Sequence, residues 1–119
     1  MIKVVALIKR RSDVTLEDFC EYYEHRHAPL FHREIPPEVA AAIKRYVQNH
    51  AVRLSRRKTD PPFDCVTEMG FDDVAGMDLW TKWYLGEGGQ VLRDDEENFM
   101  DPRQRVVIVT DERDIGVIR

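Results

Sequence analysis

Four segments of the chain alternate apolar and polar residues or form short apolar runs, and this pattern predicts four β-strands. The predicted strands cover residues 2–9, 44–54, 63–71 and 104–110. The first and last strands are rich in β-branched residues and apolar on both faces, as is typical of strands covered on both sides. We therefore expect other elements to pack against each face of the sheet.

Two segments have the periodicity of an amphipathic helix. The first begins at Thr15, which together with Asp18 nearly matches a capping box, and its apolar residues recur every three or four positions. Pro29 has no backbone N–H for a helical hydrogen bond, so this helix is expected to end or kink near His27. A second helix is predicted for residues 73–85. The buried stripe of the first helix comprises Leu16, Phe19, Cys20, Tyr23, His27, Leu30 and Phe31.

The order of the predicted elements is β-α-β-β-α-β, which is the split βαβ arrangement of ferredoxin-like domains. We therefore predict an α+β fold with a four-stranded antiparallel sheet, formed by residues 1–119 as a single domain. Both helices cover one face of this sheet, and the acidic segment 91–102 adds a short helix or a loop. The other face is uncovered, so we expect a homodimer in which two sheets meet and form a barrel.

Composition and charge argue against several classes of protein. A formal net charge of −4 gives no basic excess, so we expect no nucleic-acid partner. No apolar run approaches the roughly 18 residues of a membrane span, so we expect no membrane partner and a cytoplasmic location. Cys20 and Cys65 lack the spacing of a metal site or a disulfide framework. The basic stretch at 53–58 is interpreted as a solvated loop.

Three of the four histidines lie close together in and after the first predicted helix. Because helical residues advance by about 100° each, His27 falls on the buried stripe, whereas His25 and His32 fall on the opposite side. His25 and His27 do not face each other, so we expect no metal site. His27 has two interpretations: a structural core histidine bonded to a backbone carbonyl, or a reactive imidazole at the edge of a cavity.

Polar residues on the second and third predicted strands are further candidates. Tyr46, Gln48 and His50 alternate onto one face of the second strand, and we expect this face to point into the space between two sheets. Glu68 lies in the middle of the third strand, where an unpaired carboxylate is costly to bury. It is interpreted either as an exposed charge or as a partner for a histidine.

Five stretches span nearly the whole chain: KVVALIKRR, TLEDFCEYYEHRHAP, RYVQNH, DCVTEMGFDDV and DDEENFMD. Together they resemble the EthD family of dimeric α+β-barrel proteins, and the His-Ala-Pro at the helix end and the acidic segment are the more specific parts. The resemblance implies a ferredoxin-like homodimer with a pocket in each subunit between sheet and helices. EthD-like proteins are associated with ether degradation and with aromatic polyketide pathways.

The chain also resembles a related barrel enzyme, a muconolactone methylisomerase. This resemblance implies proton transfer by a histidine without a cofactor. Its pattern has a helix histidine and a second-strand tyrosine, to which His27 and Tyr46 correspond here. A further histidine of the isomerase lies in the loop after that strand. The equivalent loop here has no histidine, and His50 is the nearest substitute.

These observations predict a cofactor-independent enzyme that acts on a small cyclic substrate, aromatic or polyketide-like, with lyase, decarboxylase, isomerase or oxygenase chemistry. His27 is the predicted general acid or base, and Tyr46 and His50 are expected to orient a substrate oxygen or to stabilise enolate charge. Two alternatives remain: a haem-binding or haem-degrading barrel, and a non-catalytic ligand-binding or stress-response barrel with a structural His27. Substrate contacts are expected from Phe31, Glu68, Trp80 and Phe99.

Overall fold

The computed structural model describes residues 1–54 and 59–119, so most of the basic loop predicted at 53–58 lies outside the described residues. The strands are β1 (Ile2–Ile8), β2 (Arg45–His50), β3 (Cys65–Phe71) and β4 (Val106–Asp111). The α-helices are α1 (Leu16–Tyr22), α2 (Ala28–Glu34), α3 (Pro37–Ala40), α4 (Val74–Leu85) and α5 (Gln90–Glu96). A π-helical turn (Tyr23–His27) joins α1 to α2, and 3₁₀ turns occupy Glu87–Gly89 and Pro102–Gln104.

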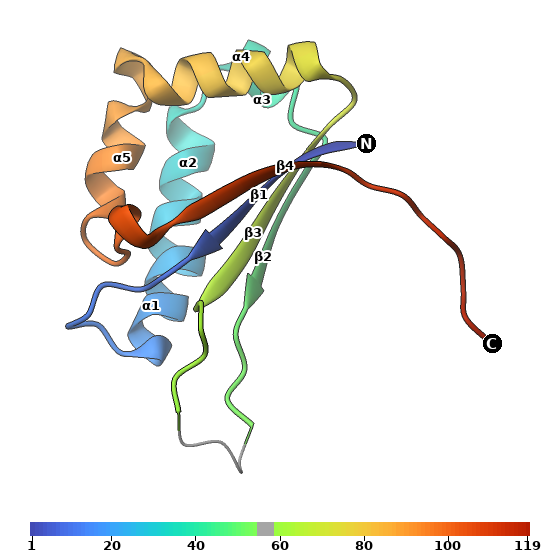
Figure 1. Ribbon diagram of the computed structural model, residues 1–119. Coiled ribbons are helices and arrows are strands. Elements are labelled where there is room, and N and C mark those ends of the chain that lie inside the picture. Colours follow the sequence, from blue (N-terminus) through green and yellow to red (C-terminus); the bar gives the residue numbers. More distant parts are fainter. Residues whose placement is uncertain (55–58) are drawn as a thin grey trace.

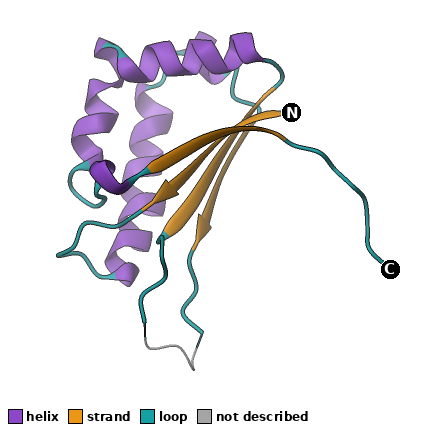
Figure 2. Ribbon diagram, in the orientation of Figure 1, coloured by secondary structure: helices purple, strands orange, loops and turns teal. Residues whose placement is uncertain are grey.

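The four strands form one antiparallel sheet in the order β2-β3-β1-β4. All described helices pack on one face of this sheet, and the opposite face carries no other described element (Figures 1 and 2). The predicted α+β, ferredoxin-like arrangement is therefore confirmed. The acidic segment contributes most of α5 and the turn after it.

The first helix begins as the sequence predicts but does not end at Pro29. Thr15 Oγ1 accepts a hydrogen bond from the Asp18 backbone N–H at 3.1 Å, which caps α1. The helical backbone then passes through the π turn, in which the Ala28 N–H donates to the Tyr23 carbonyl, and continues as α2. Pro29 stands in the first turn of α2, where a missing N–H is tolerated. The end or kink expected near His27 is therefore found as a π turn that stops at His27, and the chain stays helical beyond the proline.

The helix α5 lies against the C-terminal end of α4 because the connection between them is very tight. Asp73 caps the start of α4 by accepting from the Gly76 N–H at 2.8 Å, and the helix stops at Gly86. At Gly89 a Cβ atom would lie 2.0 Å from the Tyr84 carbonyl oxygen, so only glycine fits there. This close approach brings the carboxylates of α5 beside the last turn of α4.

The strand β2 presents Tyr46, Gln48 and His50 to the helices and not to the space beyond the sheet. Tyr46 pairs with Met69 of β3, and Gln48 pairs with Thr67. Directly paired residues share a face of the sheet, and Met69 and Thr67 are buried under the helices. The predicted orientation of this strand was therefore wrong. The large Tyr46 ring is needed on the helix side, where it stacks on Phe31 with ring centroids 5.2 Å apart.

The glutamate Glu68 lies on the opposite, uncovered face. It pairs with Val47 of β2 and Val5 of β1. Its carboxylate accepts from Lys3 Nζ at 2.8 Å and from the Asn49 side-chain amide at 2.9 Å. The predicted contact between Glu68 and a histidine is therefore wrong, because the sheet separates it from His27 and His50. Lys3 satisfies the charge on the same face.

The uncovered face also carries apolar side chains. Val5, Leu7, Val47 and Val66 are half-buried there, and Ile108 of β4 is 49% exposed. After β4, the chain runs away from the sheet to its C-terminal end (Figure 1). Among the described residues, no helix has the length and apolar character that crossing a membrane requires.

Candidate active site

A cavity of about 310 Å³ lies between the helices and the covered face of the sheet. Val4 and Ala6 of β1 and Met69 of β3 form its apolar floor. Phe31 of α2 and Trp80 of α4 form an aromatic wall, with their ring centroids 5.2 Å apart. Thr81 and Leu85 also line the cavity and are exposed, so it reaches the surface near the C-terminal end of α4. Its volume suits a small organic ligand.

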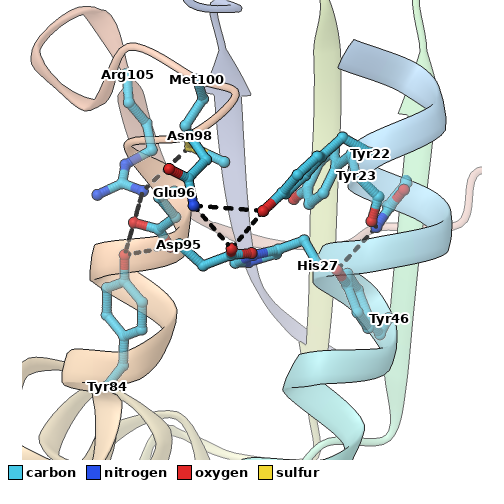
Figure 3. A network of polar contacts seen from close by, with 11 residues as sticks. Tyr22, Tyr23, His27, Tyr46, Tyr84, Asp95, Glu96, Asn98, Met100 and Arg105 are labelled. Carbon is cyan, nitrogen blue, oxygen red and sulfur yellow. Dashed lines mark hydrogen bonds and ion pairs between the residues drawn. The ribbon is translucent and has the colours of Figure 1, made fainter. Parts of the chain in front are cut away.

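The imidazole of His27 lines this cavity and is held by a carboxylate. His27 is 4% exposed, and its Nδ1 lies 2.8 Å from Asp95 Oδ2. Asp95 Oδ1 accepts from the Tyr22 hydroxyl at 2.6 Å and from the Asn98 amide at 3.2 Å. Figure 3 shows these four side chains converging from α5, its C-terminal turn and the first helix. No other hydrogen bond of His27 is found among the described side chains, so its Nε2 is available.

The environment of Asp95 favours its ionised form. Burial alone raises the pKa of this carboxyl, but hydrogen bonds from Tyr22, His27 and Asn98 outweigh burial and hold the pKa below its ordinary value. An ionised Asp95 can only accept, so we assign the proton of a neutral His27 to Nδ1. The lone pair of Nε2 is then free to accept a proton, as in other aspartate-oriented histidines.

A buried phenol, Tyr23, and a half-buried one, Tyr46, line the same cavity as the His27 imidazole. The Tyr23 hydroxyl is 2.6 Å from Thr67 Oγ1, and the Tyr46 hydroxyl accepts from the Gln48 amide at 2.9 Å. Burial raises the pKa of both tyrosines, and for Tyr46 it outweighs the hydrogen bonds from Gln48 and Tyr23, which favour the ionised form. Tyr23 and Tyr46 both line the cavity. Both phenols therefore stay protonated at neutral pH, and Tyr46 can donate its own proton to a ligand.

A second polar cluster, formed by Tyr84, Glu96 and Arg105, lines another part of the cavity. The Tyr84 hydroxyl lies 2.6 Å from Glu96 Oε1 and 2.7 Å from Oε2. Arg105 Nη1 donates to Glu96 Oε1 at 3.1 Å and to the Tyr84 oxygen at 3.2 Å. Burial, followed by the charge of Glu96, raises the pKa of Tyr84 well above its ordinary value. This cluster therefore contains a neutral phenol and one internal ion pair.

Four of the residues predicted from sequence line the cavity: His27, Tyr46, Phe31 and Trp80. Phe99 does not; it is 1% exposed and packs against the back of His27, with ring centroids 5.0 Å apart. It therefore supports the imidazole instead of forming a ligand wall.

The imidazole of His50 does not belong to the described cavity lining. Its Nε2 lies 2.8 Å from Gln48 Oε1, and its Nδ1 is buried with no partner among the described residues. Burial lowers the pKa of His50, so it is neutral at physiological pH. It packs at the edges of Phe19 and Tyr23, and so reaches the site only through Gln48 and Tyr23.

The sequence interpretation missed the residues that orient and complement His27. Asp95 and Glu96 lie in a run of four acidic residues, which is usually a solvated surface. Tyr84 and Arg105 carry no motif, and only the fold brings them to Glu96. One signal was present: the buried anchor Phe99 stands four residues after Asp95, which indicates that part of the acidic run faces the core.

The described residues contain no group of three or more His, Cys, Asp or Glu side chains that could hold a metal ion. His27 is the one cavity residue with a nitrogen free to ligate, and its neighbours Tyr23 and Phe31 offer no companion ligand of the usual metal-binding type.

Comparison with known proteins agrees with this architecture. The EthD domain family model matches residues 11–103. No curated protein sequence matches the chain. Among solved structures, an ethyl tert-butyl ether D (EthD) family protein from Bacillus halodurans is 22% identical, with a TM-score of 0.63, and the match covers 95% of this chain and 99% of that one.

Two further structures have the same fold. An EthD-like protein from Ralstonia eutropha is 18% identical with a TM-score of 0.66, and the match covers 95% of each chain. A dimeric ferredoxin-like protein of unknown function from Thermobifida fusca is 15% identical with a TM-score of 0.58, covering 92% of this chain and 88% of that one. The fold of this chain is thus one that dimeric proteins use.

Proposed function

The chain belongs to the EthD family, and from this premise we propose that its cavity is the active site of a cofactor-independent enzyme. The proposed reaction is proton transfer on a small cyclic substrate, such as an aromatic or polyketide-like ketone. The observation that carries the proposal is a buried imidazole at a cavity, oriented by a carboxylate on Nδ1 and free on Nε2. This is the arrangement that general acid–base catalysis needs.

In the proposed reaction, His27 Nε2 removes a proton from a carbon next to a substrate carbonyl. The imidazolium that forms is stabilised by Asp95, and negative charge moves to the carbonyl oxygen. Tyr46 donates a hydrogen bond to that oxygen, because its own hydroxyl accepts from Gln48 and keeps its proton available. The proton on His27 can then return to another substrate atom or to a leaving group, which accommodates isomerase and lyase chemistry.

The cavity walls support a flat, largely apolar substrate. The rings of Phe31 and Trp80 are nearly parallel, with an interplanar angle of 17°, and the Tyr46 ring also stacks on Phe31 at an angle of 29°. Val4, Ala6 and Met69 offer no charge on the floor. Such a wall favours cyclic ligands through apolar burial and offset stacking.

The proposal is tested with 2-tetralone, a small bicyclic ketone with acidic protons beside its carbonyl. Deuterium uptake at this position in D₂O, followed by proton NMR, measures proton transfer directly. Wild type should accelerate uptake over buffer, and His27→Gln should lose a factor of about 10² to 10⁴ in this acceleration. Equal rates for wild type and His27→Gln would overturn the proposal.

A matched control uses His25→Gln, because His25 is exposed on the same helix and touches only Glu21 and Glu24. Its exchange rate should equal that of wild type. Thermal unfolding should place both variants within about 2 kcal/mol of wild type. A His27→Gln protein that does not fold would favour the structural role of His27, and a Soret band after addition of haemin would favour the haem-binding alternative.

We also propose that the uncovered sheet face forms a homodimer. Its apolar residues, among them Leu7, Val66 and Ile108, are exposed or half-buried without a covering element in the described chain. Two of the similar structures are dimeric ferredoxin-like proteins. Ile108→Lys should convert the dimer to a monomer in analytical ultracentrifugation, whereas Thr110→Lys, two residues further on the same face, should have a smaller effect. A wild-type monomer would contradict this proposal.

A further inference from the structure

We infer that Tyr84, Glu96 and Arg105 form a subsite that binds a neutral hydroxyl group, so that the ligand of the cavity is a phenol or a cyclic alcohol and not a carboxylate. The inference rests on the proposed function only in placing a small cyclic ligand in the cavity. It concerns how the ligand is recognised at Tyr84, Glu96 and Arg105. These three residues take no part in the proton transfer proposed for His27.

Three separate elements bring this cluster together. Tyr84 comes from the last turn of α4, Glu96 ends α5, and Arg105 directly precedes β4. The Glu96 side chain is 7% exposed and that of Arg105 is 22% exposed. All three residues line the cavity, and Figure 3 shows Glu96 and Arg105 meeting above the Tyr84 hydroxyl. The cluster is therefore a second polar surface of the cavity, apart from the one that His27 and the two tyrosines form.

The charges of the cluster cancel each other. Arg105 carries a positive charge and its ion-pair partner Glu96 a negative one, at a distance of 3.1 Å. Tyr84 is neutral at physiological pH because burial and the neighbouring carboxylate both favour its protonated form. A carboxylate ligand would meet Glu96 as closely as Arg105 and would lose its hydration on entering. The cluster therefore disfavours an anion and leaves a neutral polar group as the matching ligand.

The hydrogen-bonding capacity left in the cluster matches a hydroxyl group. Among the described residues, Arg105 uses only Nη1, so its Nη2 and Nε remain as donors. Glu96 accepts from Tyr84 and Arg105, and a carboxylate has about four acceptor positions. A ligand hydroxyl can accept from Arg105 and donate to Glu96 together. A carbonyl or ether oxygen can satisfy only the arginine.

A purely structural cluster would tie α4, α5 and β4 together without regard to the ligand. This role predicts a loss of stability on mutation and no change in ligand preference. The two roles are separable because preference is measured as a ratio of affinities for three ligands on one protein, which cancels general effects on folding.

Equilibrium dialysis with 2-naphthol, 2-naphthoate and naphthalene tests the inference, because these probes share one ring system. Wild type should bind 2-naphthol at least about tenfold more tightly than the other two, as expected for a hydrogen bond to a charged group. Glu96→Gln should weaken 2-naphthol binding by about tenfold and tighten 2-naphthoate binding, because Arg105 is then uncompensated. Arg105→Lys keeps the charge but replaces the five donors of the planar guanidinium by the three of an ammonium, and it should reduce the 2-naphthol preference by several-fold.

The matched control is Glu97→Gln, since Glu97 is exposed and adjacent to Glu96. It should keep the wild-type order of affinities. The affinities are measured with probes on which no proton transfer is required, so failure of the proton-transfer proposal and failure of this inference give different results. Equal wild-type affinities for 2-naphthol and 2-naphthoate, no binding of any probe, or an unchanged ratio in both variants of the cluster would each overturn the inference. If Glu96→Gln does not fold, the wild-type ratio and Arg105→Lys decide.

Discussion

Asp95 and Glu96 are neighbours at the end of α5, yet their carboxylates serve opposite purposes. Asp95 faces an imidazole, the Tyr22 hydroxyl and the Asn98 amide, so every partner is neutral or can become neutral. Glu96 faces a permanent cation, Arg105, and a phenol. The carboxylate of Asp95 orients an imidazole, and the carboxylate of Glu96 forms an ion pair with a guanidinium. One helix end thus supplies the carboxylate of the proposed reactive end and the carboxylate of the proposed recognition end of the same cavity.

Neighbouring helical residues point about 100° apart, which allows two adjacent acids to reach different partners. The tight turn at Gly89 sets α5 beside α4, so Glu96 meets Tyr84. The stacked rings of Tyr22 and Phe99, with centroids 4.9 Å apart, hold the other side, so Asp95 meets His27. Asp95 and Glu96 therefore have different partners because of how α5 packs, and not because one is an aspartate and the other a glutamate.

The largest expected effect comes from removing the permanent cation. Arg105→Met leaves the carboxylate of Glu96 buried without its ion-pair partner. We expect the free energy of unfolding to fall by about 3 kcal/mol, the lower end for a broken buried pair, because Arg105 keeps some contact with solvent. Urea unfolding followed by circular dichroism measures this change.

The control for this variant is Arg103→Met, whose side chain is 88% exposed and contacts only Asp101. It should change the free energy by less than about 0.5 kcal/mol. The double variant Glu96→Gln with Arg105→Met should recover part of the loss, since no charge is then left alone. If the double variant has no higher free energy of unfolding than Arg105→Met, the ion pair between Glu96 and Arg105 does not account for the loss of stability.

The second effect is on the reactive end. Asp95→Asn places an amide beside His27 Nδ1, and its NH₂ group can donate to that nitrogen. The proton then moves to Nε2, where the lone pair is needed. Deuterium uptake by 2-tetralone should therefore fall by about 100-fold, two orders of magnitude less than the loss of about 10⁴ in an aspartate-dependent triad. Asp94→Asn, at an exposed neighbouring position, should leave the rate unchanged. An unaltered rate in Asp95→Asn would remove Asp95 from the mechanism.

The sequence predicted the fold almost completely because local patterns determine it. The Thr15 cap and the Gly86 stop are each readable within a few residues and are found where expected. All four predicted strands are present with shifted bounds, and only the face of β2 was assigned wrongly. His27 was placed correctly on the buried side of its helix by the helical period alone. Pro29 predicted an end or a kink near His27 but could not decide between them, and the structure has a π turn there followed by α2.

The site was predicted only in part because its partners come from distant segments. Asp95 is 68 residues from His27, and Arg105 meets Tyr84 across 21 residues. The face of β2 was assigned wrongly because Tyr46 and Val47 are both compatible with a buried face, and only pairing with Met69 decides between them. Glu68 could not be assigned without its partner Lys3.

A smaller effect is expected from the outer support of Asp95. Tyr22→Phe removes the hydroxyl that donates to Asp95 Oδ1 at 2.6 Å but keeps the ring that stacks on Phe99. The free energy of unfolding should fall by about 1 kcal/mol. The pKa of Asp95 should rise toward its ordinary value, because one hydrogen bond to its ionised form is lost. Carboxyl carbon NMR titration measures this shift, and an unchanged pKa would mean that His27 and Asn98 alone hold the carboxylate.

The smallest effect is the dependence of stability on pH at the reactive end. The pKa of Asp95 is lowered in the folded protein from its ordinary value of 3.8. Ionisation of Asp95 therefore stabilises the fold above that ordinary value, and this contribution is lost as pH falls through the lower, folded pKa. The difference in unfolding free energy between wild type and Asp95→Asn should be constant near about pH 6 and shrink by about 1 kcal/mol or less below about pH 3.5. The variant Arg105→Met offers the comparison, because the pKa of Arg105 is raised above its already high ordinary value and its charge does not change in this pH range. The free energies of unfolding of wild type, Asp95→Asn and Arg105→Met are measured by urea titration across this pH range. Parallel curves for the two variants would show that Asp95 and Glu96 do not differ in the way described.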